Sequence, residues 1–169
     1  MSFPRQSWLT MQRGRRPHPP GLVLVELLLL LLVLVLAVIL VLTVLGRIRR
    51  DARLERFGKE LQTFAVVLEK ARADTGQWPA TAEAAGPRLR EAGWSDGPAV
   101  GGEYGWVPPD AAGRPGQITL TAFSPHFPLD LTRRDLLALD RRIDDGDLAT
   151  GRLRTGFNGW PIYLVGEKP

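Results

Sequence analysis

Residues 22–45 form an unbroken aliphatic run, LVLVELLLLLLVLVLAVILVLTVL, whose only charged residue is Glu26. About 20 apolar residues are enough to cross a bilayer as a helix, so this run predicts a membrane-spanning segment. A cleaved secretory signal has an apolar core of roughly 7–15 residues followed by small residues. This run is longer and continues into basic residues at 47, 49 and 50. We therefore expect it to stay in the membrane.

The net positive charge of the chain lies before this run. Residues 1–21 contain four arginines and no Asp or Glu, and the rest of the chain balances its 18 acidic residues with as many basic ones. The net charge of +4 therefore belongs to the N-terminal tail. Proteins that bind nucleic acid carry their excess positive charge on the folded module, so the composition argues against nucleic acid as a partner.

Catalytic chemistry finds little support in the composition. The chain has no cysteine, which excludes disulfides, thiolate metal sites and thiol catalysis, and its two histidines are far apart in sequence. Ser124 and His126 lie in one Pro-rich stretch, whereas a catalytic triad depends on spatial geometry. We expect that the protein is not an enzyme and has no organic cofactor.

Glu26 is the residue of the aliphatic run that needs an explanation. A carboxylate inside a membrane helix costs about 2–3 kcal/mol, so it is expected to have a partner. One interpretation is that Glu26, close to the border of the run, extends its carboxylate to the lipid headgroups. The other depends on its position five residues after Gly21, at the end of a basic tail.

The segment Gly21-Leu22-Val23-Leu24-Val25-Glu26, preceded by a basic tail, resembles the processing motif of the type IV pilin and type II secretion pseudopilin family. That motif has a basic leader ending in Gly, peptidase cleavage after this Gly, and Glu at the fifth mature position. Leu22 stands where Phe or Met is commoner in the family, and Val23 stands where Thr is commoner.

The resemblance implies a role for each matched residue. Prepilin peptidase would cleave after Gly21, Leu22 would become the N-methylated N-terminus, and Glu26 would pair with the Leu22 amine of a neighbouring subunit. The chain would then be a structural subunit of a type II secretion or type IV pilus-type filament. Its partners would be other pilin-like subunits and the inner-membrane assembly platform. Basic residues flank the run on both sides, so it is this motif that indicates a cytoplasmic N-terminus and a periplasmic head, on a single-pass protein of the bacterial inner membrane.

A second interpretation of the same chain remains open. A signal-anchored protein with an extracytoplasmic binding domain would also carry one apolar run followed by a polar domain. Such a protein would not polymerise, so Glu26 would have no assembly role in it.

The residues after the run predict that its helix continues beyond the membrane. No proline occurs between Leu22 and Trp78, so one helix of about 55 residues is expected to end at Gly76 in a left-handed cap. Gly46 and Gly58 are the expected weak points for a bend. Apolar residues recur at helical spacing, and they indicate either a coiled-coil seam or, as we prefer, a face that packs on the chain's own sheet. This stripe comprises Leu54, Phe57, Leu61, Phe64, Leu68 and Ala71, and the residues expected on the solvated side are Arg56, Lys59, Glu60, Glu69 and Lys70.

The remainder predicts an α+β fold with a pilin-like layout, a long N-terminal helix packed on a small antiparallel sheet. Strands are expected at 103–107, 117–123, 152–154 and 160–165, and short helices at 81–92 and 131–143. The expected divisions are a leader (1–21), a transmembrane half-helix (22–46), an extracytoplasmic half-helix (47–76) and a globular head (77–169).

One acidic cluster lies near the C-terminus, at Asp140, Asp144, Asp145 and Asp147 around Gly146. Closely spaced carboxylates on a glycine-containing turn suit Ca²⁺, with Asp144, Asp145 and Asp147 as the candidate ligands. The family resemblance supports calcium, because major pseudopilins commonly bind it near their C-terminal strands. The alternative is an ordinary helix-to-strand turn, since the spacing is not that of an EF-hand and Asp-Gly is common turn chemistry.

Overall fold

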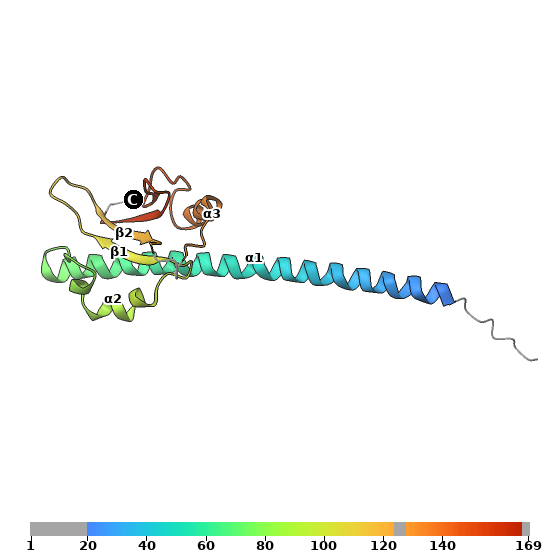
Figure 1. Ribbon diagram of the computed structural model, residues 1–169. Coiled ribbons are helices and arrows are strands. Elements are labelled where there is room, and N and C mark those ends of the chain that lie inside the picture. The colour runs from blue at the N-terminus through green and yellow to red at the C-terminus, as the bar shows by residue number, and fades with distance from the viewer. Residues whose placement is uncertain (1–19, 124–127, 167–169) are drawn as a thin grey trace, which may run out of the picture. The chain divides into compact units, whose positions relative to one another are not determined.

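The computed structural model describes residues 20–123 and 128–166, so most of the expected leader and the segment containing His126 lie outside the described residues. The chain forms two compact units, Met1–Leu45 and Gly46–Pro169. Helix α1 belongs to both units, and all the other elements lie in the second, here called the head unit (Figure 1). The elements are α1 (Pro20–Thr75), η1 (Glu83–Ala85), α2 (Pro87–Glu91), η2 (Trp94–Asp96), β1 (Glu103–Val107), β2 (Gly116–Thr121), α3 (Arg133–Ile143), β3 (Leu153–Thr155) and β4 (Pro161–Val165).

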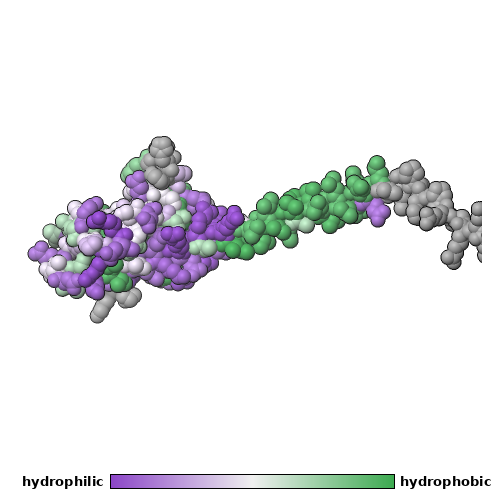
Figure 2. Space-filling model, turned by 90° about the horizontal axis from the view of Figure 1, so that it is seen from below, coloured by the Kyte–Doolittle hydropathy of each residue, from purple (hydrophilic) through white to green (hydrophobic). Residues whose placement is uncertain are grey.

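Helix α1 confirms the prediction of one long helix through the apolar run and beyond it. Every side chain from Leu24 to Leu45 is exposed, and Figure 2 shows a hydrophobic surface along this segment. The helix ends where Gly76 adopts a φ of 77°, and its N–H donates to the Arg72 carbonyl over 2.7 Å. The expected left-handed cap is therefore present.

The second half of α1 packs on the sheet of the head unit, as preferred from the sequence. Its apolar stripe from Leu54 to Leu68 is at most 4% exposed. It shares one core with Ile118 and Leu120 of β2 and with Tyr163 of β4. Aromatic contacts add to this packing, because the Phe64 ring meets the rings of Tyr104 and Trp94 edge-on, at 4.9 and 5.1 Å between centroids.

The sheet has four antiparallel strands in the order β1-β2-β4-β3. Each expected strand is present, with small shifts at its ends, so the mixed α+β architecture is confirmed. Tyr163 sits opposite Ile118 on one side and Leu153 on the other, which places buried apolar residues side by side on the face that meets α1. This register directs alternate side chains into the core.

Glu60 corrects one expectation from the helical pattern. Its side chain is only 14% exposed instead of fully solvated. It accepts hydrogen bonds from the Tyr104 hydroxyl, over 2.7 Å, and from the Ala99 N–H, over 3.4 Å. Burial, with the Glu60 carboxylate beside the hydroxyl, raises the pKa of Tyr104. Through these two hydrogen bonds, Glu60 holds β1 and the loop before it against α1.

Helix α3 crosses α1 at Gly58, which the sequence suggested as a weak point. The structure gives this glycine a packing role, because a Cβ there would lie 2.9 Å from Leu139 Cδ1 and 3.3 Å from Ile143 Cγ2. The start of α3 is set by a capping box that the sequence analysis missed. The Thr132 hydroxyl accepts from the Asp135 N–H, and the Asp135 carboxylate accepts from the Thr132 N–H.

Candidate functional site

The residues of the expected processing motif lie at the start of α1. Gly21 and Leu22 are in its first turn, and Glu26 follows about one turn later. The Glu26 side chain is exposed and has no hydrogen bond or ion pair with the described residues. Between Leu24 and Leu45 the only other polar side chain is Thr43, whose hydroxyl donates to the Ile39 carbonyl over 2.8 Å. Glu26 is therefore the one polar group of this stretch that the helix itself does not satisfy.

The same helix is long and apolar enough to cross a bilayer. Its best 18-residue window has a mean hydropathy of 3.6, and none of that window is buried. Length and composition support a membrane span near the N-terminus.

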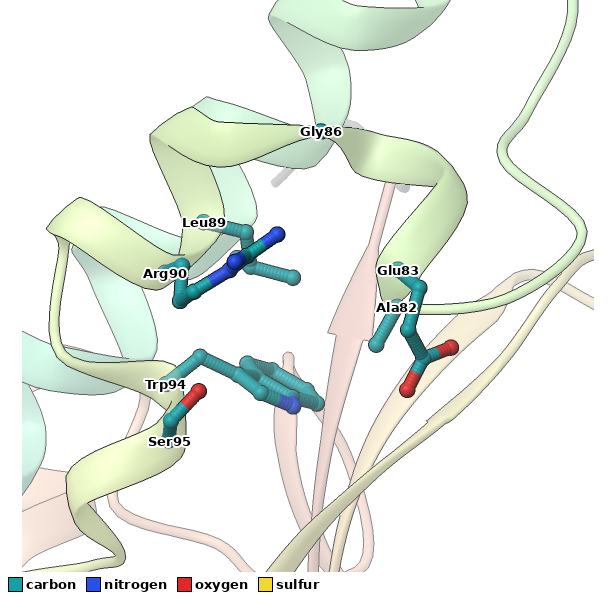
Figure 3. A pocket seen from close by; sticks show the side chains of 7 residues that line it. All are labelled: Ala82, Glu83, Gly86, Leu89, Arg90, Trp94 and Ser95. Atoms are coloured by element: carbon teal, nitrogen blue, oxygen red, sulfur yellow. The ribbon is translucent and has the colours of Figure 1, made fainter.

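A small pocket opens between η1, α2 and η2 (Figure 3). Its walls include Leu89 and Arg90 of α2 and Trp94 of η2, and its volume is about 100 Å³. Small-molecule sites usually occupy several hundred Å³, so this pocket offers a cofactor or substrate little room.

The acidic loop, defined here as residues 144–152, joins α3 to β3 and is held together by its own carboxylates. Asp144 accepts from the backbone N–H groups of Arg152 and Leu153, the latter over 2.8 Å. Asp145 accepts from the Asp147 N–H over 2.9 Å and from the Thr150 hydroxyl over 2.7 Å. These bonds tie the start of β3 to the end of α3.

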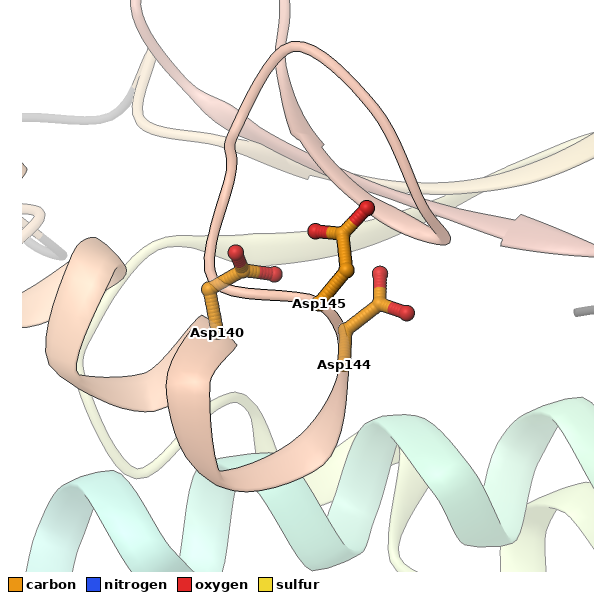
Figure 4. A group of neighbouring side chains, drawn as sticks. All are labelled: Asp140, Asp144 and Asp145. Atoms are coloured by element: carbon orange, nitrogen blue, oxygen red, sulfur yellow. The ribbon is translucent and has the colours of Figure 1, made fainter.

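Asp140, in the last turn of α3, has no such partners. Its side chain is fully buried, and neither carboxylate oxygen has a hydrogen-bond partner among the described residues. Carboxylate oxygens of Asp140, Asp144 and Asp145 lie within 4.8 Å of one another (Figure 4). Three carboxylates this close form a donor set that a hard divalent cation can use.

Burial raises the pKa of Asp140 to about 6, and the charges of Asp144, Asp145 and Asp147 act in the same direction. The Gly146 amide offsets part of this effect, although its geometry falls short of a hydrogen bond. An ionised Asp140 is therefore costly unless a positive charge accompanies it.

The group of three differs from the ligand set expected from the sequence. The structure groups Asp140 with Asp144 and Asp145, whereas Asp147 is exposed and uses its Oδ1 to accept from the Ala149 N–H over 3.0 Å. The signal for Asp140 was available in the sequence, because Asp140 and Asp144 are four residues apart at the end of a helix and so share a face.

Gly151 allows the acidic loop to close against these carboxylates. Its φ is 66°, and a Cβ there would lie within 2.9 Å of Asp145 Oδ2 and still closer to Asp144 Oδ2. A side chain at this position would force the loop away from both carboxylates.

Glu26 in the apolar segment and the buried Asp140 in the head unit thus lack a partner among the described residues, in surroundings that disfavour a lone charge. Comparisons with family models, curated proteins and solved structures find no match to this chain.

Replacing Asp140 by Asn is expected to change how stability depends on pH. Because the folded-state pKa of Asp140 is raised to about 6, its favourable contribution is complete below about pH 4 and is lost as the pH rises through 6. In a chelating buffer, Asp140→Asn should therefore stabilise the protein at pH 7.5 by up to about 3 kcal/mol, since one pKa unit corresponds to about 1.4 kcal/mol. Near pH 4.5 the gain should shrink. Urea unfolding of the detergent-solubilised chain, followed by tryptophan fluorescence, measures both values.

Asp96→Asn is the matched control, because Asp96 is exposed in η2 and lies outside the group of three. It should leave the free energy of unfolding within about 0.5 kcal/mol of the wild-type value at both pH values. A less stable Asp140→Asn protein at pH 7.5 in chelator would contradict the assignment of a costly buried charge.

Proposed function

We propose that this chain is a pilin-like structural subunit of the pseudopilin type. Prepilin peptidase removes residues 1–21 by cleavage after Gly21, and the new N-terminus at Leu22 is methylated. The subunit waits in the bacterial inner membrane with its head on the periplasmic side. It then enters a filament of a type II secretion or type IV pilus-type machine through the inner-membrane assembly platform.

The observation that carries the proposal is Glu26. It is a lone carboxylate among exposed aliphatic side chains, five residues after a glycine that ends a basic tail. In lipid such a charge needs a counter-charge. Cleavage at Gly21 creates one, since the amine of Leu22 on a neighbouring subunit is positively charged and lies at the matching depth.

The apolar half of α1 supports the same proposal. Its exposed residues must be covered by lipid or by other helices, since contact with water is unfavourable. Bundling the helices of neighbouring subunits keeps this surface out of water after the subunit leaves the membrane. The head unit has its own core, so it can stay folded through that transfer.

The second interpretation, a signal-anchored protein that does not polymerise, assigns different roles to the same residues. It explains the apolar helix and the separate head unit, and it gives Glu26 and Gly21 no role. Processing and the requirement for Glu26 therefore discriminate between the two.

Intact-mass spectrometry of the membrane-extracted protein tests processing. With prepilin peptidase present in the host, the mass should correspond to loss of residues 1–21 and gain of one methyl group at Leu22. Without the peptidase, the chain should begin at Met1. An unprocessed chain in both hosts would leave the anchored, non-polymerising protein as the better description.

Glu26→Ala tests assembly. We expect incorporation into filaments to fall more than about tenfold, because the variant leaves the amine of the neighbouring subunit unpaired at a cost of about 2–3 kcal/mol. Crosslinking of membrane-extracted protein, or co-purification with sheared filaments, measures incorporation.

Thr43→Ala is the matched control in the same segment, because the Thr43 hydroxyl already bonds to the Ile39 carbonyl within its own helix. It should assemble like the wild type. If Glu26→Ala also assembles normally after correct processing, pairing between Glu26 and Leu22 is wrong.

A second proposal concerns the head unit, where Asp140, Asp144 and Asp145 are the candidate ligands of a calcium ion. The supporting observation is the buried Asp140 carboxylate without a hydrogen-bond partner, since calcium would supply both the missing contacts and the missing charge. By joining α3 to the acidic loop, the ion would stabilise the end of the sheet that β3 forms.

Thermal unfolding with and without calcium tests this second proposal. At about 100 times its Kd, calcium should stabilise the wild-type head by about 2.7 kcal/mol and raise its Tm. Asp140→Asn should lose this gain, whereas Asp147→Asn should keep it because Asp147 lies outside the group of three. Equal calcium responses in all three proteins would contradict the ligand assignment.

A further inference from the structure

The head unit concentrates arginines at the end where its chain continues into the apolar segment. We call this surface the arginine collar. Four of its members are in α1 and two are in the first turn of α3. They are Arg47, Arg49, Arg50, Arg53, Arg133 and Arg134.

Two ion pairs hold the start of α3 beside the turn of α1 that carries Arg50 and Arg53. Arg50 contacts Asp135 over 2.6 Å, and Arg53 contacts Asp130 over 2.9 Å. Burial alone would raise the pKa of the Asp135 carboxyl, but hydrogen bonds from Thr132 and Arg50 outweigh it and hold that pKa below its usual value. Asp135 is therefore ionised at neutral pH and keeps α3 in place.

The other four arginines of the collar are left as positive surface. Arg47, Arg49, Arg133 and Arg134 are exposed, and none forms an ion pair with another residue in the described part of the chain. Asp51, the acidic residue among them in α1, pairs with Arg142 over 3.6 Å. The collar therefore carries a surplus of positive charge, although the chain after residue 21, taken as a whole, is balanced.

Helix stability does not explain this placement. Arg133 and Arg134 occupy the first turn of α3, where the partial positive charge of a helix N-terminus disfavours cations and attracts anions. The Asp135 carboxylate of the capping box already occupies the helix end, so it is the Arg133 and Arg134 side chains that present positive charge to an anion from outside the chain.

The position of the collar along α1 indicates the source of that anion. Arg50 lies four residues after Gly46, which is about 6 Å of helix. The headgroup layer on each side of a bilayer is about 5–7 Å thick. With residues 22–45 in the hydrocarbon, the collar residues that follow Gly46 most closely along the chain, Arg47, Arg49 and Arg50, reach the headgroup layer.

We propose that the arginine collar binds the headgroups of anionic phospholipids and so seats the head on the membrane surface. Arg47 and Arg49 contact the phosphates from α1, and Arg133 and Arg134 contact them from α3. Each arginine near an anionic surface contributes about 1 kcal/mol, and the attraction fades within a Debye length of about 10 Å. This inference needs the membrane span and does not depend on assembly into a filament.

Native mass spectrometry of the full chain in detergent, titrated with phosphatidylglycerol or phosphatidylcholine, tests the collar. The wild type should retain phosphatidylglycerol in preference to phosphatidylcholine. Arg133→Gln and Arg134→Gln should each weaken phosphatidylglycerol binding about fivefold and leave phosphatidylcholine binding unchanged. The preference should also fall as salt rises above about 0.1 M.

Arg90→Gln is the matched control. Arg90 is an exposed arginine of α2, and α2 is tied to the C-terminal end of α1 by the pair of Arg88 with Asp74. Asp74 is 24 residues, or about 36 Å of helix, beyond Arg50.

Circular dichroism checks that each variant folds. Equal retention of the two lipids by the wild type would overturn the proposal, and so would an unchanged preference in a folded Arg133→Gln/Arg134→Gln protein.

Discussion

The contact between one face of α1 and the sheet is the interaction on which the head unit depends. The stripe from Leu54 to Leu68 is almost fully buried and supplies one side of the core, while β2 and β4 supply the other. Removing several large apolar side chains from water in one place is the main favourable term in such a fold. The short strands could not form a stable sheet without this helix, because a small sheet needs a packed face.

Polar contacts then determine how the other elements sit around that core. Glu60 fastens β1 to α1, Gly58 lets α3 approach α1 closely, and Asp135 fixes the start of α3 against Arg50. With its start fixed, α3 brings Asp140 to the acidic loop at its other end. The candidate cation site thus lies at one end of α3, and the two α3 arginines of the collar lie at the other.

Both functional proposals follow from carboxylates that the described part of the chain leaves without a partner. Glu26 is exposed in an apolar segment, and Asp140 is buried in the head unit. In each place a negative charge is unfavourable without a positive one. Under the two proposals, a neighbouring subunit's amine would supply that charge in the first case, and a calcium ion would supply it in the second. The arginine collar is the reverse case, a surplus of cations for which anionic headgroups are the proposed partner.

The sequence by itself determined one long helix ending at Gly76, the approximate positions of the four strands and the isolation of Glu26, because these follow from local periodicity and hydropathy. Only the tertiary structure decided that Glu60 turns inward, that Asp140 rather than Asp147 joins Asp144 and Asp145, and that the first turn of α3 lies beside Arg50. Those outcomes depend on contacts between residues far apart in the chain. The spacing of residues and the composition do not tell which segments come together when the core is buried.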